Sequence, residues 1–173
     1  MQNKPEVKLL SDRLILREFI IEDALAMYNL NDNPKVLKFT GDSSFSSVQE
    51  AKRFIKNYDQ YKKNGFGRWA VILKETNTFI GWCGLKQHEN GKIDLGFRFF
   101  EKEWNKGYAT ESAKLCLEFA IKNGLEKKLI GRVHKDNIAS SKVLEKIGFI
   151  RTGKVECNGF NDAILFEYNP RLN

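Results

Sequence analysis

The feature that most constrains the fold is a change of hydrophobic period in the middle of the chain. Three runs rich in β-branched and aromatic residues lie at 69–73, 79–85 and 93–100, and the last two are separated by a turn at 88–91. These runs favour an antiparallel meander. From Gly107 to Asn123 the apolar residues instead recur at helical spacing, and 129–133 is again typical of a strand. A strand, a helix and a strand in this order form a crossover, which predicts that 93–100 and 129–133 are parallel neighbours.

The segments before the meander predict one strand and two helices. Apolar and charged residues alternate over 13–17, as in a strand. A helix is expected to open at Glu22-Asp23 and to end before Pro34. A second helix is expected to begin with a capping box at Ser47-x-x-Glu50 and to continue to Asn64-Gly65.

The segments after the crossover predict a short helix and a closing pair of strands. The helix covers 138–147 and is stopped by Gly148, while 149–152 and 163–168 form an antiparallel pair. The expected fold class is therefore α/β (α+β), with a mostly antiparallel sheet and one parallel junction. The length of 173 residues is that of one domain, so residues 1–173 are expected to form a single unit.

The charge of the chain suggests a polyanionic partner but not nucleic acid. Lys+Arg outnumber Asp+Glu by 29 to 22, a net charge of +7, and 21 of the cations are lysine. Bidentate contacts to bases and phosphates favour arginine, so a lysine excess argues against direct nucleic-acid binding. A phosphate-bearing cofactor and a merely solvated lysine surface both remain open.

Other functional classes are disfavoured by composition. No apolar run approaches the ~18 residues of a membrane span, and the N-terminus shows no apolar signal region. Three dispersed cysteines and two histidines favour neither a disulfide framework nor a metal centre. A cytoplasmic protein without a metal and without a membrane association is expected.

The strand-to-helix turn at 104–111 is the best candidate for chemistry. The start of a helix leaves backbone N–H groups free at the positive end of its dipole, and Gly107 lets a phosphate approach closely. Lys106 adds a cation. Because neither GxGxxG nor GxxxxGK[ST] is present, dinucleotide and P-loop NTPase sites are disfavoured. Asn137-x-x-Ser140 opens the next helix, and Asn137 alone is equally explained as a helix cap.

Taken together and in order, these segments resemble a known family. Five segments carry the resemblance: Arg13 to Arg17 with Asp23, Leu95-Gly96-Phe97, 104–111, Asn137-x-x-Ser140, and Glu145 to Phe149. They are similar to the RimJ/RimL-type branch of the GNAT superfamily, the acetyl-CoA-dependent N-acetyltransferases. The resemblance extends from about residue 11 to residue 168.

The resemblance implies where acetyl-CoA, the only cosubstrate expected, would bind. In this family two parallel strands splay apart and pantetheine lies between them, beside the residues that correspond here to Phe97, Arg98 and Phe99. The pyrophosphate would be wrapped by the segment that opens the long helix: Asn105, Lys106, Gly107, Tyr108, Ala109 and Thr110. Asn137 would contact the cofactor arm. Asn105 stands where the family often has Gly, and Arg98 where it often has an aromatic residue.

The resemblance also implies direct attack by an amine on the thioester, because no cysteine stands at a motif position. Asp94 occupies the acidic position before Leu-Gly-Phe and is the candidate base, acting through a bridging water; a solvated strand carboxylate is the alternative. Many members use a Tyr as the acid where this chain has Leu144. Ser140 is the substitute candidate, and an ordinary first-turn serine is its alternative.

The acceptor is left open between a small amine and a protein N-terminus. In the family its specificity lies mainly in residues 22–65 and the last hairpin. Asp42, Glu50 and Asp59 are candidates to attract a cationic acceptor, or are surface charges. Two further readings of function remain: an acyl-CoA-binding sensor without turnover, and a module that binds RNA or the ribosome. The family offers both monomers and homodimers.

Overall fold

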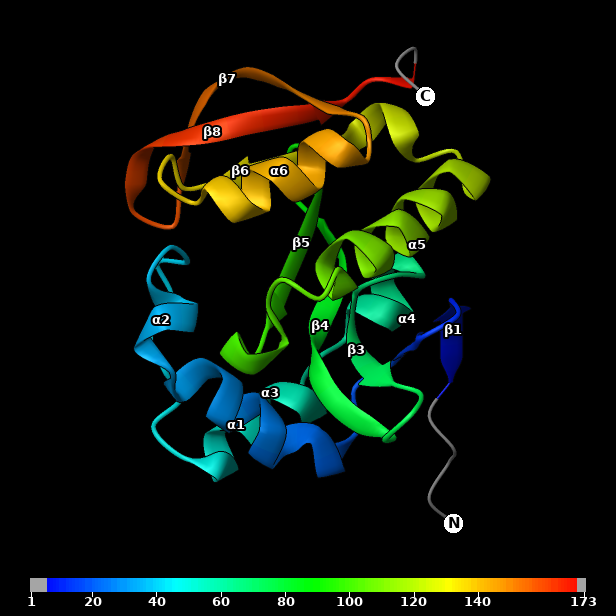
Figure 1. Cartoon of the computed structure of the whole chain (residues 1–173), viewed down its shortest axis with the longest axis vertical. Coiled ribbons are helices and arrows are strands. Elements are labelled where there is room, and N and C mark those ends of the chain that lie inside the picture. The colour runs from blue at the N-terminus through cyan, green and yellow to red at the C-terminus, as the bar shows by residue number, and fades with distance from the viewer. Residues whose placement is uncertain (1–5, 171–173) are drawn as a thin grey trace.

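One mixed sheet organises the molecule. The computed structural model describes residues 6–170, and its eight strands follow the order β1-β2-β3-β4-β5-β6-β8-β7 (Figure 1). Of the neighbouring pairs, only β5 and β6 run parallel among the described residues. The strands are β1 (Val7–Leu10), β2 (Leu14–Arg17), β3 (Arg68–Leu73), β4 (Thr78–Gln87), β5 (Ile93–Phe99), β6 (Leu129–Val133), β7 (Phe149–Cys157) and β8 (Phe160–Tyr168).

The helices fall into two groups along the chain. The first is α1 (Ala24–Asp32), α2 (Pro34–Leu37), α3 (Val48–Lys56) and α4 (Gln60–Asn64). The second is α5 (Tyr108–Lys122) and α6 (Ile138–Lys146). Short 3-10 turns occupy Ile21–Asp23, Glu101–Glu103 and Glu126–Lys128. In Figure 1, α1 and α3 gather at the end of the molecule opposite β7 and β8, while α5 and α6 pass in front of the sheet.

Both faces of the sheet are covered. Small residues on α5, among them Ala113, Cys116 and Ala120, are fully buried and let the helix pack closely on the main core. A smaller cluster on the opposite face joins Met27 and Leu30 of α1 to Trp82 of β4. The central strands are therefore covered on both faces of the sheet. A ligand could reach them only where two neighbouring strands separate.

The structure corrects the second predicted helix, the last two strands and the capping box, and it adds one strand. Residues 47–64 form two helices instead of one, since Tyr58 and Tyr61 turn toward Arg68 of β3. The Tyr58 hydroxyl accepts a hydrogen bond from the Arg68 backbone N–H (2.7 Å), and the Tyr61 hydroxyl donates one to the Arg68 carbonyl (2.5 Å). The last two strands are longer than predicted and meet at Asn158-Gly159, both left-handed. β1 was not predicted at all. Of the capping box, the Ser47 hydroxyl accepts the Glu50 N–H as expected, but the Glu50 carboxylate bonds Ser46.

The predicted parallel pair is present and opens after two residues. β5 and β6 pair only through Ile93 with Leu129 and Asp94 with Ile130. Further along, β5 stays bonded to β4 up to Phe99 and β6 to β8 up to Val133. The two strands therefore separate beyond Asp94, which confirms the predicted GNAT fold with its central splay.

Candidate active site

A cavity of about 980 Å³ lies at the opening of the splay. Its walls come from the end of β5, the turn before α5, the first turns of α6, and α2 with the loop that follows it. Ten residues predicted for the site line it: Phe97, Arg98, Phe99, Asn105, Gly107, Tyr108, Ala109, Thr110, Asn137 and Ser140. Two of the predicted residues, Lys106 and Asp94, are not among its lining residues.

The turn before α5 is built from two left-handed residues. Asn105 has φ 61° and Gly107 has φ 84°. Asparagine tolerates this conformation better than most residues, so the turn survives at the position where the family often has Gly. The helix begins immediately afterwards, and its first-turn N–H groups have no partner within the helix. These amides and the helix dipole form an anion-binding wall.

Arg13 of the loop before β2 holds this turn from behind. Its Nε donates to Glu111 Oε2 (2.7 Å), its Nη1 donates to the Lys106 carbonyl (3.0 Å), and its guanidinium lies 4.6 Å from the Tyr108 ring. Burial alone would raise the pKa of Glu111, but hydrogen bonds from Ser11 and Arg13 outweigh it and lower that pKa. Sequence reasoning assigned Glu111 only to the helix dipole and missed the role of Arg13.

The start of α6 presents a hydroxyl to the cavity. The Asn137 side chain accepts the Ser140 N–H (3.2 Å), so the cap predicted from the sequence is present. The Ser140 hydroxyl lines the cavity and has no hydrogen-bond partner among residues 6–170. Leu144 is 1% exposed and packs against Gly131, where a Cβ would lie 2.5 Å from its Cδ1. Of these two positions, only that of Ser140 offers a proton donor to the cavity.

The cations that face the cavity differ from the one singled out in the sequence. Lys106 forms an ion pair with Glu103 (2.9 Å). Lys142 and Lys146 of α6 line the cavity, and no carboxylate of the described chain pairs with either. Their i,i+4 spacing on the helix that Asn137 caps was a signal that could have found them.

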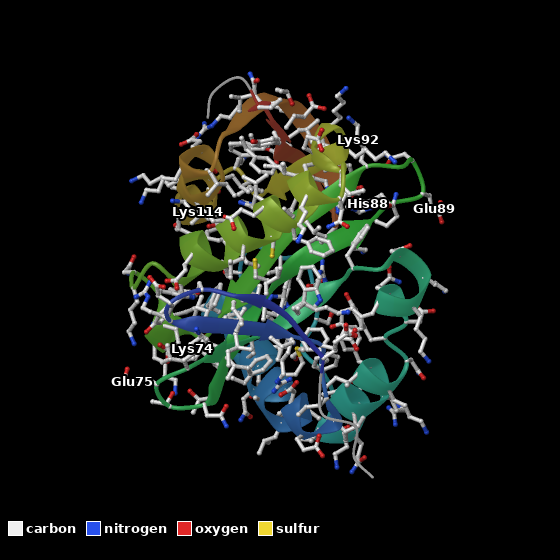
Figure 2. The ribbon with its side chains drawn as sticks, turned by 90° about the vertical axis from the view of Figure 1, so that its right-hand side faces the viewer. Lys74, Glu75, His88, Glu89, Lys92 and Lys114 are labelled. Atoms are coloured by element: carbon white, nitrogen blue, oxygen red, sulfur yellow. The ribbon has the colours of Figure 1, made fainter. Side chains whose placement is uncertain are left out.

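Asp94 lies at the closed end of the splay. Its carboxylate accepts a hydrogen bond from Arg132 Nε (2.9 Å), and His88 Nε2 is 3.5 Å away. Figure 2 shows His88 near the turn that joins β4 and β5. Burial disfavours the charged form of Arg132, yet the attraction of Asp94 outweighs it and raises the pKa of Arg132. The structure therefore engages Asp94 in an ion pair instead of directing it into the cavity.

Arg98 reaches an acidic group. It bonds Asn31 of α1 and Asp42 of the loop after α2, the latter at 2.5 Å, and its side chain is 11% exposed. Burial lowers the pKa of Arg98 in spite of the opposing effect of Asp42. Arg98 thereby ties α1 and the loop after α2 to the splayed edge of β5.

Comparison with known proteins decides the family. The model of the Acetyltransferase (GNAT) domain matches residues 13–150. The chain belongs to the GNAT acetyltransferase family. This GNAT protein is 28% identical over 148 residues to the uncharacterized N-acetyltransferase p20 of Bacillus licheniformis, covering 84% of this chain and 83% of the relative.

Two solved structures resemble this GNAT protein. One is a GNAT-family acetyltransferase from Bacillus anthracis, with a TM-score of 0.75 and 26% identity over 91% of this chain and 94% of that one. The other is RimL, the ribosomal L7/L12 alpha-N-protein acetyltransferase, with a TM-score of 0.78 and 16% identity over 96% and 95% of the two chains. The second likeness shows the fold alone.

The expected enzyme class is therefore confirmed: the protein is an acetyl-CoA-dependent GNAT N-acetyltransferase. Within residues 6–170, no helix has the length and hydrophobicity that crossing a bilayer requires. In the same part of the chain, no group of three or more His, Cys, Asp or Glu side chains is arranged to hold a metal ion.

Proposed function

We propose that this enzyme acetylates a primary amine by direct attack on acetyl-CoA bound in the 980 Å³ cavity. The observation that carries the proposal is the splay after Asp94, which opens a cavity flanked by the N-termini of both α5 and α6. Two helix N-termini favour negative charge at the same opening. A phosphate-bearing cosubstrate that must lie between two strands fits this arrangement.

The lining residues divide into three binding roles. The amides from Asn105 to Thr110 hold the pyrophosphate, because they carry the unpaired first-turn N–H groups of α5. The free edge of β5 from Phe97 to Phe99 lies along the pantetheine, with Asn137 opposite. Lys142 and Lys146 are positioned for a further phosphate group, while Lys106 contributes its charge from outside the lining.

In the reaction, a C–N bond forms as the C–S bond breaks, one proton leaves the amine and the sulfur gains one. Ser140 is the proton donor for the leaving thiolate, because its hydroxyl faces the cavity without another partner in the described chain. Asp94 accepts the amine proton through water, since its ion pair with Arg132 holds it away from direct contact.

The cysteines do not favour an acetyl-enzyme. None of the three lines the cavity. Cys83 and Cys116 are buried against each other (3.6 Å between sulfurs), and burial raises the pKa of the Cys116 thiol. Burial likewise raises the pKa of Cys157. Thiols with raised pKa values are poor nucleophiles, which leaves direct attack as the mechanism.

The test combines binding with turnover. The purified protein is incubated with acetyl-CoA and a panel of peptides and small amines while release of free thiol is followed, and calorimetry measures acetyl-CoA binding separately. Binding together with thiol release supports the proposal. Binding without release on every amine would instead assign the protein as an acyl-CoA sensor, and no binding would refute the cavity assignment.

The role of Ser140 has its own test. Ser140→Ala should lower kcat about 100-fold, the range that one general acid contributes, with little change in KM for acetyl-CoA. Thr152→Ala on β7, an exposed hydroxyl outside the cavity, is the matched control and should leave both constants unchanged. An unchanged rate for Ser140→Ala at saturating substrate would remove Ser140 as the acid.

A further inference from the structure

A second cavity, of about 430 Å³, shares no lining residue with the first. Arg68 and Lys86 line it, together with residues of the segment around α4. The Arg68 guanidinium lies 4.4 Å from the centre of the Trp82 ring, and the Arg98 guanidinium, which lines the first cavity, lies 5.4 Å from the same centre. One residue from the lining of each cavity therefore lies against the same ring.

The charge of the second cavity is uncompensated and positive. Neither Arg68 nor Lys86 pairs with a carboxylate anywhere in residues 6–170. The acid in the lining, Asp59, is already bound to Lys63 (2.5 Å), and this hydrogen bond lowers the pKa of Asp59. An anion entering this cavity would meet two cations that have no ion-pair partner in residues 6–170.

Arg68 is also held firmly enough to form a specific site. Its backbone N–H donates to the Tyr58 hydroxyl and its carbonyl accepts from the Tyr61 hydroxyl. Burial raises the pKa of both tyrosines, so both hydroxyls stay neutral and keep these bonds. The guanidinium lies over the Trp82 ring, 4.4 Å from its centre, and no carboxylate of residues 6–170 pairs with its N–H groups.

The carboxylates that the sequence offered for a cationic acceptor are all engaged. Asp42 pairs with Arg98, Glu50 accepts two hydrogen bonds from Ser46, and Asp59 pairs with Lys63. Asp94, directly across from Lys86 on the neighbouring strand, pairs with Arg132. These four carboxylates are thus already engaged, whereas Arg68 and Lys86 have no carboxylate partner in the described chain. A cationic acceptor such as a polyamine would require the opposite arrangement.

We propose, resting on the proposed function, that the acceptor is a small primary amine that also carries an anionic group. Arg68 and Lys86 bind the anion in the second cavity, and the amine extends past Trp82 toward the thioester in the first. A volume of about 430 Å³ suits a small molecule. A carboxylate and a phosphate share this chemistry, and both enter the test.

The test uses acceptors that differ in the charge of the distal group. The carboxylate pair is 4-aminobutanoate and 4-aminobutanamide; the phosphate pair is phosphoethanolamine and ethanolamine; 1,4-diaminobutane is the cationic comparison. The expected result is a kcat/KM at least tenfold higher for the anionic member of one or both pairs, the factor of one hydrogen bond to a charged group. The pair that shows the larger ratio identifies the anion.

Variants then locate the preference. Arg68→Gln and Lys86→Gln should each lower kcat/KM for the anionic amine about tenfold and leave the neutral partner within about twofold. Lys62→Gln, an exposed lysine of α4 outside the cavity, is the control and should change neither.

Several outcomes would overturn the inference. One is a kcat/KM for the neutral or cationic amines that equals or exceeds that for the anionic amines. Another is an equal loss of kcat/KM on both members of a pair in Arg68→Gln. The third is no turnover of any anionic amine. If acetyl-CoA still binds in calorimetry, the proposed function survives such a failure. If acetyl-CoA does not bind, it is the proposed function that has failed.

Discussion

The replacement Arg13→Gln tests how the pyrophosphate turn is held. It removes the ion pair with Glu111 and the hydrogen bond to the Lys106 carbonyl, and it leaves the backbone of β2 intact. The Arg13 side chain is 46% exposed and that of Glu111 is 20% exposed. An ion pair this accessible contributes about 0.2–1 kcal/mol, so the free energy of unfolding should fall by less than about 1 kcal/mol.

The effect on acetyl-CoA binding should be larger than the effect on stability. The bond to the Lys106 carbonyl fixes the residue between the two left-handed positions, Asn105 and Gly107. Its loss lets the turn depart from the geometry that aims the α5 amides. The variant also leaves the Glu111 charge without its guanidinium beside an anionic ligand. A loss equivalent to one charge-assisted hydrogen bond, about 1.4 kcal/mol, raises the Kd for acetyl-CoA about tenfold.

The assay is isothermal calorimetry with acetyl-CoA, paired with urea unfolding. The control is Arg151→Gln, which breaks a similarly exposed pair between Arg151 and Glu145 (51% and 43% exposed) outside the cavity lining. It should lower stability by a comparable amount and leave the Kd unchanged. The reasoning is refuted if Arg13→Gln binds acetyl-CoA within about twofold of the original protein, or if both variants weaken binding equally.

The same pair has a pH dependence with a defined sign. The pKa of Glu111 is lowered in the folded protein, from an ordinary value of 4.5. Because the pKa of Glu111 is lower in the folded protein, ionised Glu111 stabilises the fold fully above pH 4.5. This stabilisation is lost as the pH falls through the pKa of the folded protein. The stability difference between the original protein and Arg13→Gln should therefore be largest near neutral pH and shrink below pH 4.5.

Two further replacements separate catalytic from structural roles. Asp94→Asn should lower kcat/KM at least tenfold and displace the acidic limb of its pH profile; a loss of melting temperature with an unchanged profile would leave Asp94 only as the partner of Arg132. Leu144→Tyr places extra volume against Gly131 and should lower the free energy of unfolding by about 1–3 kcal/mol without raising kcat. A higher kcat would show that the new hydroxyl reaches the cavity.

The fold was predictable because its decisive pattern is local. The change of period between 93–100 and 107–123 is visible in consecutive residues, and a crossover has few alternatives. The misses have side-chain contacts or a weak period as their cause. The helix over 47–64 breaks where Tyr58 and Tyr61 reach Arg68 on another element. β1 escaped notice because it has four residues and none is fully buried, so its period is weak.

The candidate site divides in the same way. The turn at 105–110 consists of neighbours in sequence, and its left-handed positions were recognisable from Asn and Gly. The support from Arg13 spans 98 residues to Glu111, and no periodicity reports such a contact. Lys106 was singled out as a phosphate-binding cation because it lies within the turn, but its side chain forms an ion pair with Glu103. The lysines that line the cavity come instead from α2 with its C-terminal end (Lys35, Lys38) and from α6 (Lys142, Lys146).

Net charge was therefore a poor guide to ligands, whereas the pairing of individual charges is informative. The excess of +7 pointed to a polyanion, and three carboxylates pointed to a cationic acceptor. In the folded protein those carboxylates are engaged, and cations without carboxylate partners in the described chain face both cavities: Lys38, Lys142 and Lys146 the first, Arg68 and Lys86 the second. Because the two cavities share no lining residue, each cationic group attracts a separate anion, and an acceptor that carries negative charge need not compete with acetyl-CoA for the same cations.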